Sequence, residues 1–587
     1  MVNRTRTRLN LKKAWLLGAA AVVGIALLAL AFLLLNLAYA PAAETLSAVK
    51  AAIDKQQKIE ADIQSYYQAG NFTFDNPLVI QDPYQAAPLT ALVIFDTPED
   101  SQITIHLPGK TLDAAVDYTF SGFRKHHEIP IYGLYAGTLN HITLSLKTQN
   151  GDSHQTEIDL QTETLPVYIQ TITVDEVDHT QYNPGFNLAL DDHKTIFDVN
   201  GDVRWYATQA SFQVLTPLEN GRFLFTYSVG DHKEGNLVME QDLLGKVYAV
   251  YNVDDGINHE IYELPSGNLL ITTSDLKSDT VQDHLIEVDP QSGHVVRTFD
   301  MKKYLDSTRP TSLDSDTNDW LHLNSIVYDP TDDTIIISSR SQSAVIKMTY
   351  PGMQIKWILG PHDNWSAKYQ PYLLTPIGDN FEWPWSQHHA TLYGPDVAGD
   401  NTVDILLFDN GLYRSFNLAT AYSPAEWYSR LVHYRINEAD MTVEQVWDYG
   451  KQYGGGSYSL NKGSAFLLPN GDILGTWGTI ARDSQGKPTA DISDGNVYTT
   501  KIVEVDPATD KVAFAGTIPD TSTYRTLRIG FYDKYSENND YLSTPINNTS
   551  SNDLIDRGRL AGQDIYRLIN SNPLSLFVKR ALRHFLK

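Results

Sequence analysis

Apolar and polar residues alternate in short runs along most of the chain, and from about residue 184 these runs recur in pairs. In one kind of pair, a run ends in Asp, Asn or Tyr, a polar or glycine-containing turn follows, and a second run carries Val, Trp, Tyr or Phe. Its copies are FDVNGDVRWY (197–206), QDLLGKVYAV (241–250), EVDPQSGHVVRTF (287–299), MTYPGMQIKWIL (348–359), RINEADMTVEQVW (435–447) and EVDPATDKVAFAG (504–516). Between them lie LENGRFLFTY (218–227), LPSGNLLITT (264–273), DPTDDTIIISS (329–339), GDNTVDILLFDN (399–410) and LPNGDILGTW (468–477). Two hairpins per unit, spaced about 45–50 residues apart, are typical of four-stranded propeller blades.

The six copies of the first hairpin predict an all-β fold with a six-bladed β-propeller over residues 184–545. The sixth blade should close with strands from both ends of this region, near 184–196 and 520–533. Ordinary β-meanders in a sandwich are the alternative, but the regular spacing and the scarcity of helical patterns favour the propeller. The long gaps at 360–435 and 448–504 are read as insertions, which often build the functional site.

The segment 75–165 precedes the repeats and alternates between apolar and polar positions in several short runs. Examples are ALVIFDT, SQITIHLPG, HITLSLKTQ and HQTEIDLQTE. This pattern predicts a small N-terminal β-sandwich domain. It contains no cluster of residues that suggests catalysis.

The chain begins with a basic segment, 1–13, followed by an apolar segment, 14–38. The uninterrupted run AWLLGAAAVVGIALLALAFLLL is long enough to cross a bilayer core of about 30 Å as a transmembrane helix. The basic flank should stay in the cytoplasm, which places everything after Tyr39 outside. A cleaved signal peptide is the alternative, since Ala38-Tyr39-Ala40 fits a cleavage site. We therefore expect a single-pass membrane protein with an extracytoplasmic catalytic part, or a secreted protein if cleavage occurs.

Helical patterns flank the β-rich region. Residues 42–70 are rich in Ala, Lys, Glu and Gln and predict a helical stalk. Residues 560–587 include LSLFVKRALRHFLK, a basic amphipathic tail that could lie on an anionic membrane or pack on protein. Both segments offer surfaces for pairing into a homodimer, so the oligomeric state stays open.

Composition narrows the function classes. The formal net charge is −26, which disfavours nucleic-acid binding because that requires a basic surface. The absence of cysteine excludes disulfides, thiolate metal sites and cysteine nucleophiles. A position outside the cytoplasm also disfavours ATP and nucleotide sulfate donors.

Histidines provide the strongest chemical signal. His259, His322 and His388 each precede a strand that enters the second hairpin of a unit, so they should meet at one mouth of the channel. Arg340 ends the strand IIISSR, and Asn324 lies on the same strand face as His322 because strands have a period of two. A single such histidine is usually structural, but this combination is hard to explain by packing.

Two chemistries suit these residues. Three histidines could ligate zinc or copper. Alternatively, one histidine is a nucleophile while the others, with Arg340 and Asn324, bind an oxyanion such as sulfate or phosphate. The guanidinium favours the anion because it would repel a nearby metal cation. Trp383 and Trp385, in the run FEWPW (381–385), could provide an aromatic wall.

Four segments make the chain resemble the bacterial arylsulfate sulfotransferase family over roughly residues 75–545. They are NHEIYELPSGNLL (258–270), HLNSIVYDPTDDTIIISSRSQSAVIKM (322–348), WILGPHDNW (357–365) and EWPWSQHH (382–389). The chain departs from the family at Asn258, where a histidine is common, and in having no cysteine for the disulfide of some members.

The resemblance implies transfer of a sulfuryl group from a phenolic sulfate ester to a phenol, in a ping-pong cycle without a nucleotide donor or other cofactor. By motif, His388 would be the histidine that is transiently sulfated, rather than His389. The resemblance also implies the remaining site residues. His259, His322, Asn324 and Arg340 match sulfate-binding and acid/base positions, Ser457 or Ser459 would add a polar ligand, and Tyr524 and Arg525 match a late segment that approaches the site.

Two other functions remain open at this point. One is a metal-dependent hydrolase or oxidase that uses the three histidines as ligands. The other is a non-catalytic, surface-anchored propeller that binds ligands, since fold does not determine function.

Overall fold

A computed structural model describes residues 50–228, 235–312, 318–394, 401–423, 426–490, 496–534 and 541–542, without the side chain at 254. Lys55–Ser228 and Lys233–Ser551 belong to one compact unit; the described residues 50–54 belong to a second unit. No helix among the described residues is long and apolar enough to cross a membrane. The predicted anchor 14–38, the basic segment 1–13 and the tail 560–587 lie outside the described residues, whereas residues 50–69 of the predicted stalk are helical.

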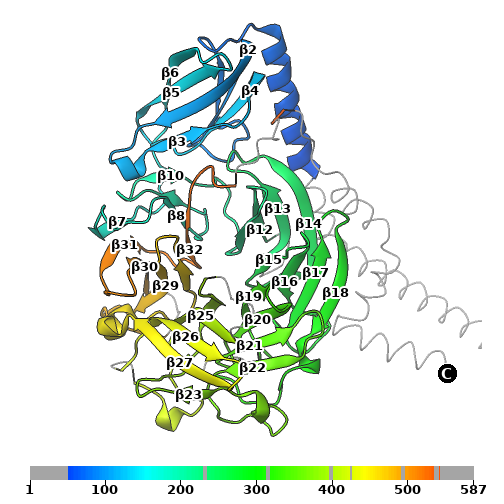
Figure 1. The fold of residues 1–587 in the computed structure, drawn as a ribbon, viewed down its shortest axis with the longest axis vertical. Coiled ribbons are helices and arrows are strands. Elements are labelled where there is room, and N and C mark those ends of the chain that lie inside the picture. The colour runs from blue at the N-terminus through cyan, green and yellow to red at the C-terminus, as the bar shows by residue number, and fades with distance from the viewer. Residues whose placement is uncertain are drawn as a thin grey trace, which may run out of the picture. The chain divides into compact units, whose positions relative to one another are not determined.

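The N-terminal domain is one six-stranded antiparallel sheet that is organised around a single long strand (Figure 1). Its strands are β1 (Leu78–Gln81), β2 (Ala91–Leu107), β3 (Val116–Thr119), β4 (Arg124–Ile131), β5 (Leu139–Thr148) and β6 (Ser153–Gln161), with a 3-10 turn η1 (Leu112–Ala114). The predicted runs ALVIFDT and SQITIHLPG are not separate strands, because β2 continues through both of them with a register shift between Asp96 and Ser101. The first half of β2 pairs with β1 and β4, and its second half pairs with β3 and β5.

Six further sheets in the described residues form a propeller-like ring, and we number them as blades (Figure 1). Blade 1 contains β32 (Thr526–Ile529), β8 (Phe186–Ala189), β9 (Ile196–Phe197) and β10 (Val203–Trp205). Blade 2 contains β11 (Leu215–Pro217), β12 (Phe223–Tyr227), β13 (Gly235–Gln241) and β14 (Val247–Ile257). Blade 3 contains β15 (Ile261–Glu263), β16 (Leu269–Thr273), β17 (His284–Asp289) and β18 (His294–Asp300).

Blade 4 has four strands like the first three blades, whereas blades 5 and 6 each have a fifth strand. Blade 4 contains β19 (Leu323–Asp329), β20 (Thr334–Ser339), β21 (Ala344–Thr349) and β22 (Ile355–Leu359). Blade 5 contains β24 (His388–Leu392), β25 (Thr402–Asp409), β26 (Arg430–Asn437), β27 (Thr442–Tyr449) and the parallel strand β23 (Thr375–Ile377). Blade 6 contains β28 (Ser464–Leu467), β29 (Ile473–Arg482), β30 (Val497–Val505), β31 (Val512–Pro519) and β7 (Thr173–Val177). Short 3-10 turns occur at η2 (Met301–Lys303), η3 (Gln370–Tyr372), η4 (Leu418–Thr420) and η5 (Lys451–Ser457).

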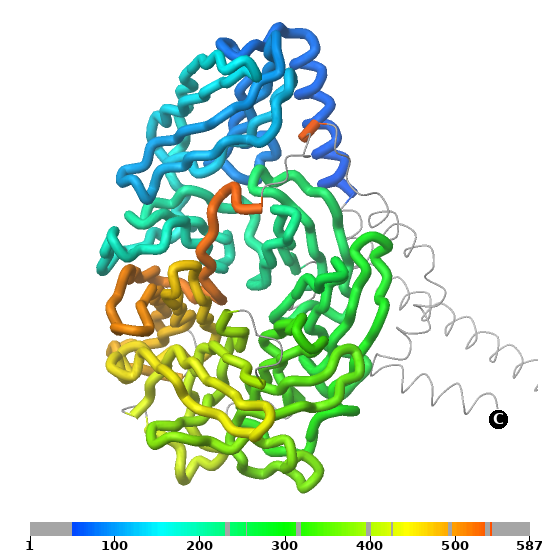
Figure 2. The backbone as a smooth tube through the Cα atoms, in the orientation of Figure 1, coloured from blue at the N-terminus to red at the C-terminus, as the bar shows by residue number. Residues whose placement is uncertain are grey.

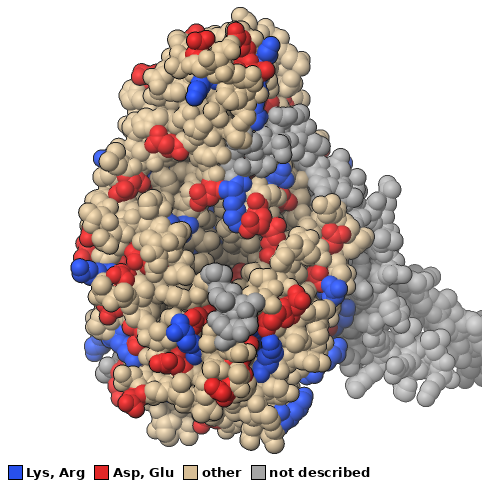
Figure 3. Space-filling model, in the orientation of Figure 1, with Lys and Arg blue, Asp and Glu red and all other residues tan. Residues whose placement is uncertain are grey.

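All of the predicted hairpins form, and the ring closes as the sequence predicted. In blade 1, β32 pairs with β8 in the register Thr526 to Ala189, although the two strands are more than 300 residues apart. Figure 2 shows the chain returning in this way, with the orange segment near 530 beside the blue-green segment near 186. Figure 3 shows that the surface is hollowed near the middle of the ring and that acidic and basic side chains are interspersed around the hollow.

The hydrophobic core lies between neighbouring blades. The core cluster between blades 4 and 5, for example, joins Val327, Ile336 and Trp357 to Ile405 and Tyr434, all of them buried. Because both faces of these strands are covered, their sequences are apolar on both sides rather than strictly alternating. Each such side chain contributes about 1.5–3 kcal/mol when it is fully buried. This packing holds the ends of the first strands in a fixed arrangement.

Candidate active site

The first strands of the blades all begin on one face of the ring, and this arrangement brings the predicted histidines together. His322 immediately precedes β19, His388 is the first residue of β24, and His259 lies two residues before β15. The imidazole centroids of His259 and His322 are 4.6 Å apart. The charge on protonated His322 also disfavours protonation of His388, which lowers the pKa of that side chain in addition to the larger effect of burial. The three histidines therefore form one cluster from three blades.

Asn410 holds the ring of His388 in one orientation. Asn410 Nδ2 donates hydrogen bonds to the carbonyl oxygens of Ser459 (3.0 Å) and Lys462 (2.9 Å), which turns Oδ1 toward His388. The distance from Oδ1 to His388 Nδ1 is 2.7 Å. Because an amide oxygen can only accept, Nδ1 carries the proton and Nε2 keeps its lone pair. No described residue hydrogen-bonds Nε2.

The environment also keeps His388 neutral. Burial lowers the pKa of His388 well below its usual range, and the nearby Arg340 guanidinium lowers it further. The side chain is therefore unprotonated at neutral pH. A neutral imidazole with a free Nε2 lone pair is a competent nucleophile.

Arg340 is placed by a tight turn that follows β20. Its backbone N–H donates to the carbonyl of His322 (3.1 Å), and its carbonyl accepts from the N–H of Ser343 (3.1 Å). The residue is only 8% exposed. Arg340 and Asn410 occupy the same position in neighbouring blades, since each directly follows the second strand.

Asn324 links two blades beneath the histidines. Its Nδ2 donates to the carbonyl of Gln387 (2.7 Å), the residue before His388. The amide has a second N–H, while its Oδ1 is buried without a hydrogen-bond partner among the described residues. This arrangement ties the backbone of β19 to the start of β24.

His322 and His259 have different polar partners. His322 Nδ1 hydrogen-bonds the carboxylate of Asp319, which can balance the positive charge of an imidazolium. His259 Nε2 lies 2.9 Å from Gln282 Oε1, and its Nδ1 lies 3.2 Å from the hydroxyl of Tyr524. Burial, together with His322 and then His388, lowers the pKa of His259 well below its usual range.

Tyr524 and Arg525 support the cluster from blade 1. The Arg525 guanidinium pairs with Glu260 (2.7 Å) and donates to the carbonyl of Asn324 (3.0 Å). The Tyr524 hydroxyl lies 3.3 Å from the same carbonyl. Both side chains contact residues of the cluster. The charge of Arg525 is balanced by its ion pair with Glu260.

The predicted aromatic and serine residues differ in whether they contact residues of the cluster. Trp383 packs against Phe381 and His362 in the core between blades 4 and 5. Trp385 is half-buried, and its backbone N–H donates to Asp409 (2.9 Å), next to Asn410. The side chain of Ser459 bonds backbone groups, and its carbonyl holds Asn410. Ser457 ends η5 two residues earlier, without a described contact to the cluster.

His389 is directed away from His388. Its φ of +51° turns the backbone, and its Nδ1 donates to the carbonyl of Ala465 (3.0 Å) in blade 6. The ring packs on Phe466 with centroids 4.2 Å apart. His389 thus connects blade 5 to blade 6, whereas the adjacent His388 faces the cluster.

Two residues of the cluster were not predicted from the sequence, Asn410 and Asp319. Asn410 ends the quoted hairpin GDNTVDILLFDN at the position that Arg340 occupies in the preceding blade, so a comparison of blades could have found it. Asp319 lies in a loop three residues before His322, where no periodic pattern marks it.

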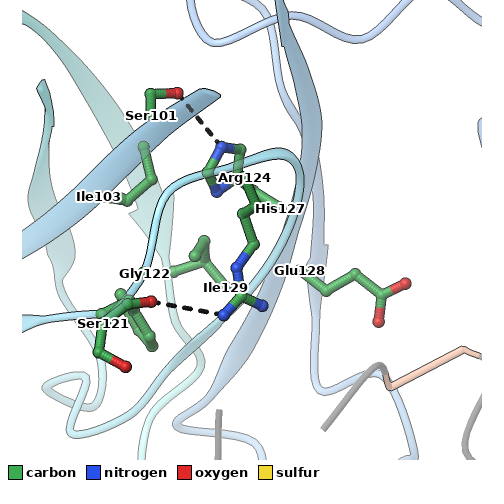
Figure 4. A pocket seen from close by; sticks show the side chains of 9 residues that line it. Ser101, Ile103, Ser121, Gly122, Arg124, His127, Glu128 and Ile129 are labelled. Atoms are coloured by element: carbon green, nitrogen blue, oxygen red, sulfur yellow. Dashed lines mark hydrogen bonds between the residues drawn. The ribbon is translucent and has the colours of Figure 1, made fainter. Parts of the chain in front are cut away.

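Among the described residues, no group of three or more His, Asp or Glu side chains is arranged to hold a metal ion. The N-terminal domain has a cavity of about 10 Å³ beside Ser101, Arg124 and His127 (Figure 4). A cavity of about this size holds one water molecule and is too small for an aryl ester.

Comparison with known proteins agrees with the histidine cluster. Residues 157–525 match the arylsulfotransferase (ASST) family, and residues 78–163 match the arylsulfotransferase Ig-like domain. The chain is 28% identical over 575 aligned residues to arylsulfate sulfotransferase AssT of Escherichia coli O6:H1, covering 77% of this chain and 92% of the relative. AssT of Lelliottia amnigena is 26% identical over the same shares. Among solved structures, the periplasmic gluconolactonase PpgL of Pseudomonas aeruginosa is 11% identical, and the match covers 73% of this chain and 99% of PpgL. Its TM-score of 0.29 is too low to assign a fold. The family match spans most of the described ring and all the residues of the cluster, and the chain belongs to the arylsulfotransferase family of sulfotransferase enzymes.

Proposed function

We propose that the protein moves a sulfuryl group from a phenolic sulfate ester to a phenol through a sulfated His388. The observation that carries this proposal is the orientation of His388, whose Nδ1–H is held by Asn410 at 2.7 Å while Nε2 keeps its lone pair. Burial and Arg340 keep the imidazole neutral by lowering its pKa. A fixed, neutral imidazole beside a guanidinium suits nucleophilic attack on an anionic sulfate.

In the first half-reaction, His388 Nε2 attacks the sulfur, and the bond from sulfur to the aryl oxygen breaks. The electron pair of that bond leaves with the aryl oxygen. Like phosphoryl transfer, this reaction has a loose transition state in which charge develops on the leaving oxygen and on the equatorial oxygens. Arg340 and the second N–H of Asn324 are the donors proposed for the equatorial oxygens. Preorganised donors of this kind are worth about 3–4 kcal/mol each.

His322 is the proposed general acid and base. Protonated His322 gives its Nε2 proton to the departing aryl oxygen, while Asp319 keeps the Nδ1–H in place. The phenol leaves, and His322 is then neutral. In the second half-reaction, His322 accepts the proton of the acceptor phenol, whose oxygen attacks the sulfur. The bond between sulfur and Nε2 breaks, and its electron pair returns to His388.

The placement of this reaction outside the cytoplasm belongs to the same proposal. It is supported by the basic flank and the apolar segment 14–38, and by a donor that needs no nucleotide. Protease treatment of spheroplasts, whose cytoplasmic membrane is intact and accessible, should degrade the catalytic part, and complete protection would contradict this placement.

The proposal is tested with 4-nitrophenyl sulfate, with and without phenol, followed by mass spectrometry of the peptide that contains His388. We expect a sulfuryl group on His388 without acceptor and its loss when phenol is added. His388→Ala should abolish transfer. His389→Ala is the matched control, because His389 is a neighbouring buried histidine that faces blade 6, and it should retain most of the activity. Equal loss in both variants would refute the assignment of the nucleophile.

A further inference from the structure

Four side chains from distant parts of the sequence form a stack next to the histidine cluster. The Arg309 guanidinium lies over the ring of Trp365 (4.1 Å to the centroid) and over the ring of Phe416 (4.6 Å). Phe416 in turn contacts Trp385, with ring centroids 5.0 Å apart and a tilt of 54°. Trp365 and Arg309 are buried, whereas Phe416 and Trp385 are only half-buried. The stack therefore presents two aromatic rings at its partly exposed end.

Arg309 is a fixed support for this stack. Its N–H groups donate to the carbonyl oxygens of Asp363 (2.9 Å), Pro361 (3.0 Å) and Gln342. These three acceptors are backbone carbonyls, and Nη1 also donates to the side-chain Oε1 of Gln342 (3.3 Å), so four contacts fix the guanidinium between loops. Arg309 consequently helps to hold the position of the Phe416 ring that lies against it.

The exposed end of the stack adjoins the residues proposed for catalysis. Gln342, which Arg309 holds, lies in the turn that carries Arg340. The carbonyl of Trp385 accepts from the N–H of Gly411 (3.0 Å), directly after Asn410. Trp385 is also three residues before His388 along the chain. An aryl group attached to a sulfate between Arg340 and His388 would thus have these two rings within reach.

We propose that Phe416 and Trp385 form the aryl subsite and that Phe416 determines which phenols are accepted. This inference rests on the proposed function and names the substrate class of the same site. Both rings are half-buried, so part of each is open to contact with an aryl group. Since offset and tilted aromatic contacts add favourable energy, a two-ring phenol such as 2-naphthol should be preferred over phenol.

The first test measures acceptor preference with the full-length chain and 4-nitrophenyl sulfate as donor. We expect Phe416→Ala to reduce the ratio of kcat/KM for 2-naphthol to kcat/KM for phenol by about five- to tenfold, the size of one aromatic contact. At saturating donor the nitrophenolate burst that reports sulfation of His388 should keep its amplitude, because His388 is intact, while the donor concentration that gives half of the burst rate should rise. Phe416→Leu should lose the preference while it keeps apolar volume in the loop.

Phe381→Ala is the matched control, because Phe381 is also half-buried and packs on a tryptophan, Trp383, at 4.6 Å. It should leave the acceptor ratio unchanged. A Phe416→Ala variant with the wild-type ratio would overturn the proposal. The proposal would also be overturned if both alanine variants showed a lower acceptor ratio, a smaller burst and a lower melting temperature. That result would indicate a general packing defect.

A second test does not depend on turnover. Binding of 2-naphthyl sulfate to His388→Ala is measured by calorimetry, with and without Phe416→Ala. Weaker binding by about five- to tenfold supports the subsite even if the wild-type chain transfers no sulfuryl group, in which case only the proposed function fails. Equal binding in the two variants overturns the subsite even if transfer occurs.

Discussion

The contact between Asn410 and His388 offers the sharpest test of the proposed chemistry. Asn410→Leu keeps the approximate size of the side chain but removes the acceptor for His388 Nδ1 and both donors to Ser459 and Lys462. Asn410→Asp loses the same two donors but keeps an acceptor for Nδ1 and adds a negative charge. The two variants therefore differ in whether His388 Nδ1 keeps its acceptor.

The expected magnitudes follow from the geometry. Leaving one buried hydrogen-bonding group unsatisfied costs about 1–3 kcal/mol, which corresponds to roughly 5- to 150-fold in rate if the cost falls on the reactive orientation of His388. Asn410→Leu should lower the rate of His388 sulfation by this factor, and the acid limb of its pH profile should move to lower pH, because the hydrogen bond to Asn410 raises the pKa of His388. In Asn410→Asp, the carboxylate favours the imidazolium and raises the pKa of His388, so the acid limb of the pH profile should move to higher pH.

Stopped-flow release of nitrophenolate in a single turnover measures this step directly between about pH 4.5 and 8. Asn437→Leu serves as the control, since Asn437 is a half-buried asparagine at the end of β26 that donates a hydrogen bond to Asp440. It should retain the wild-type rate and profile. The reasoning is refuted if Asn410→Leu keeps more than half of the sulfation rate, or if Asn410→Asp leaves the acid limb unmoved.

Three further predictions concern pH and proton transfer. Asp319→Asn should slow transfer from esters of weakly acidic phenols by about tenfold or more while sparing 4-nitrophenyl sulfate, which needs little protonation on leaving; equal effects on both donors would contradict the acid role. Arg340→Gln removes a cation that lowers the pKa of His388, so the acid limb of kcat/KM should shift to higher pH, and an unshifted limb would contradict this. His259, His388 and His389 have pKa values lowered by burial, so the unfolded chain takes up protons below about pH 6.5 that the folded chain excludes. The free energy of unfolding should therefore fall as the pH drops below about 6.5, and His389→Leu should weaken this dependence in denaturant titrations.

The repeat was predictable because each blade carries its own local signal. Hairpin turns, apolar strands and their spacing recur in the sequence, and even the closure of β8 with β32 followed from counting strands. The continuity of β2 was not predictable, because the polar residues between Asp96 and Ser101 are typical of a turn. In the structure, the strand continues because both of its halves pair with other strands of the sheet.

The convergence of the site residues could be predicted where they occupy equivalent positions in successive blades. His259, His322, Arg340 and His388 occupy repeated positions at strand ends, so the repeat alone brings them together. Asp319 and Phe416 lie in irregular loops, and contacts between loops decide where such side chains point. Trp383 is near the cluster in sequence and packs against the core between two blades, and its position in the sequence does not reveal this packing.

The pairing of β32 with β8 has a consequence for biosynthesis. Tyr524 and Arg525, which brace His259 and Asn324, are among the last residues of the ring to leave the ribosome. A nascent chain can stack five sheets early, yet the buried carbonyl of Asn324 lacks these two donors until the final strand docks. Docking of β32, rather than formation of the earlier sheets, is thereby the step that completes the surroundings of the histidine cluster.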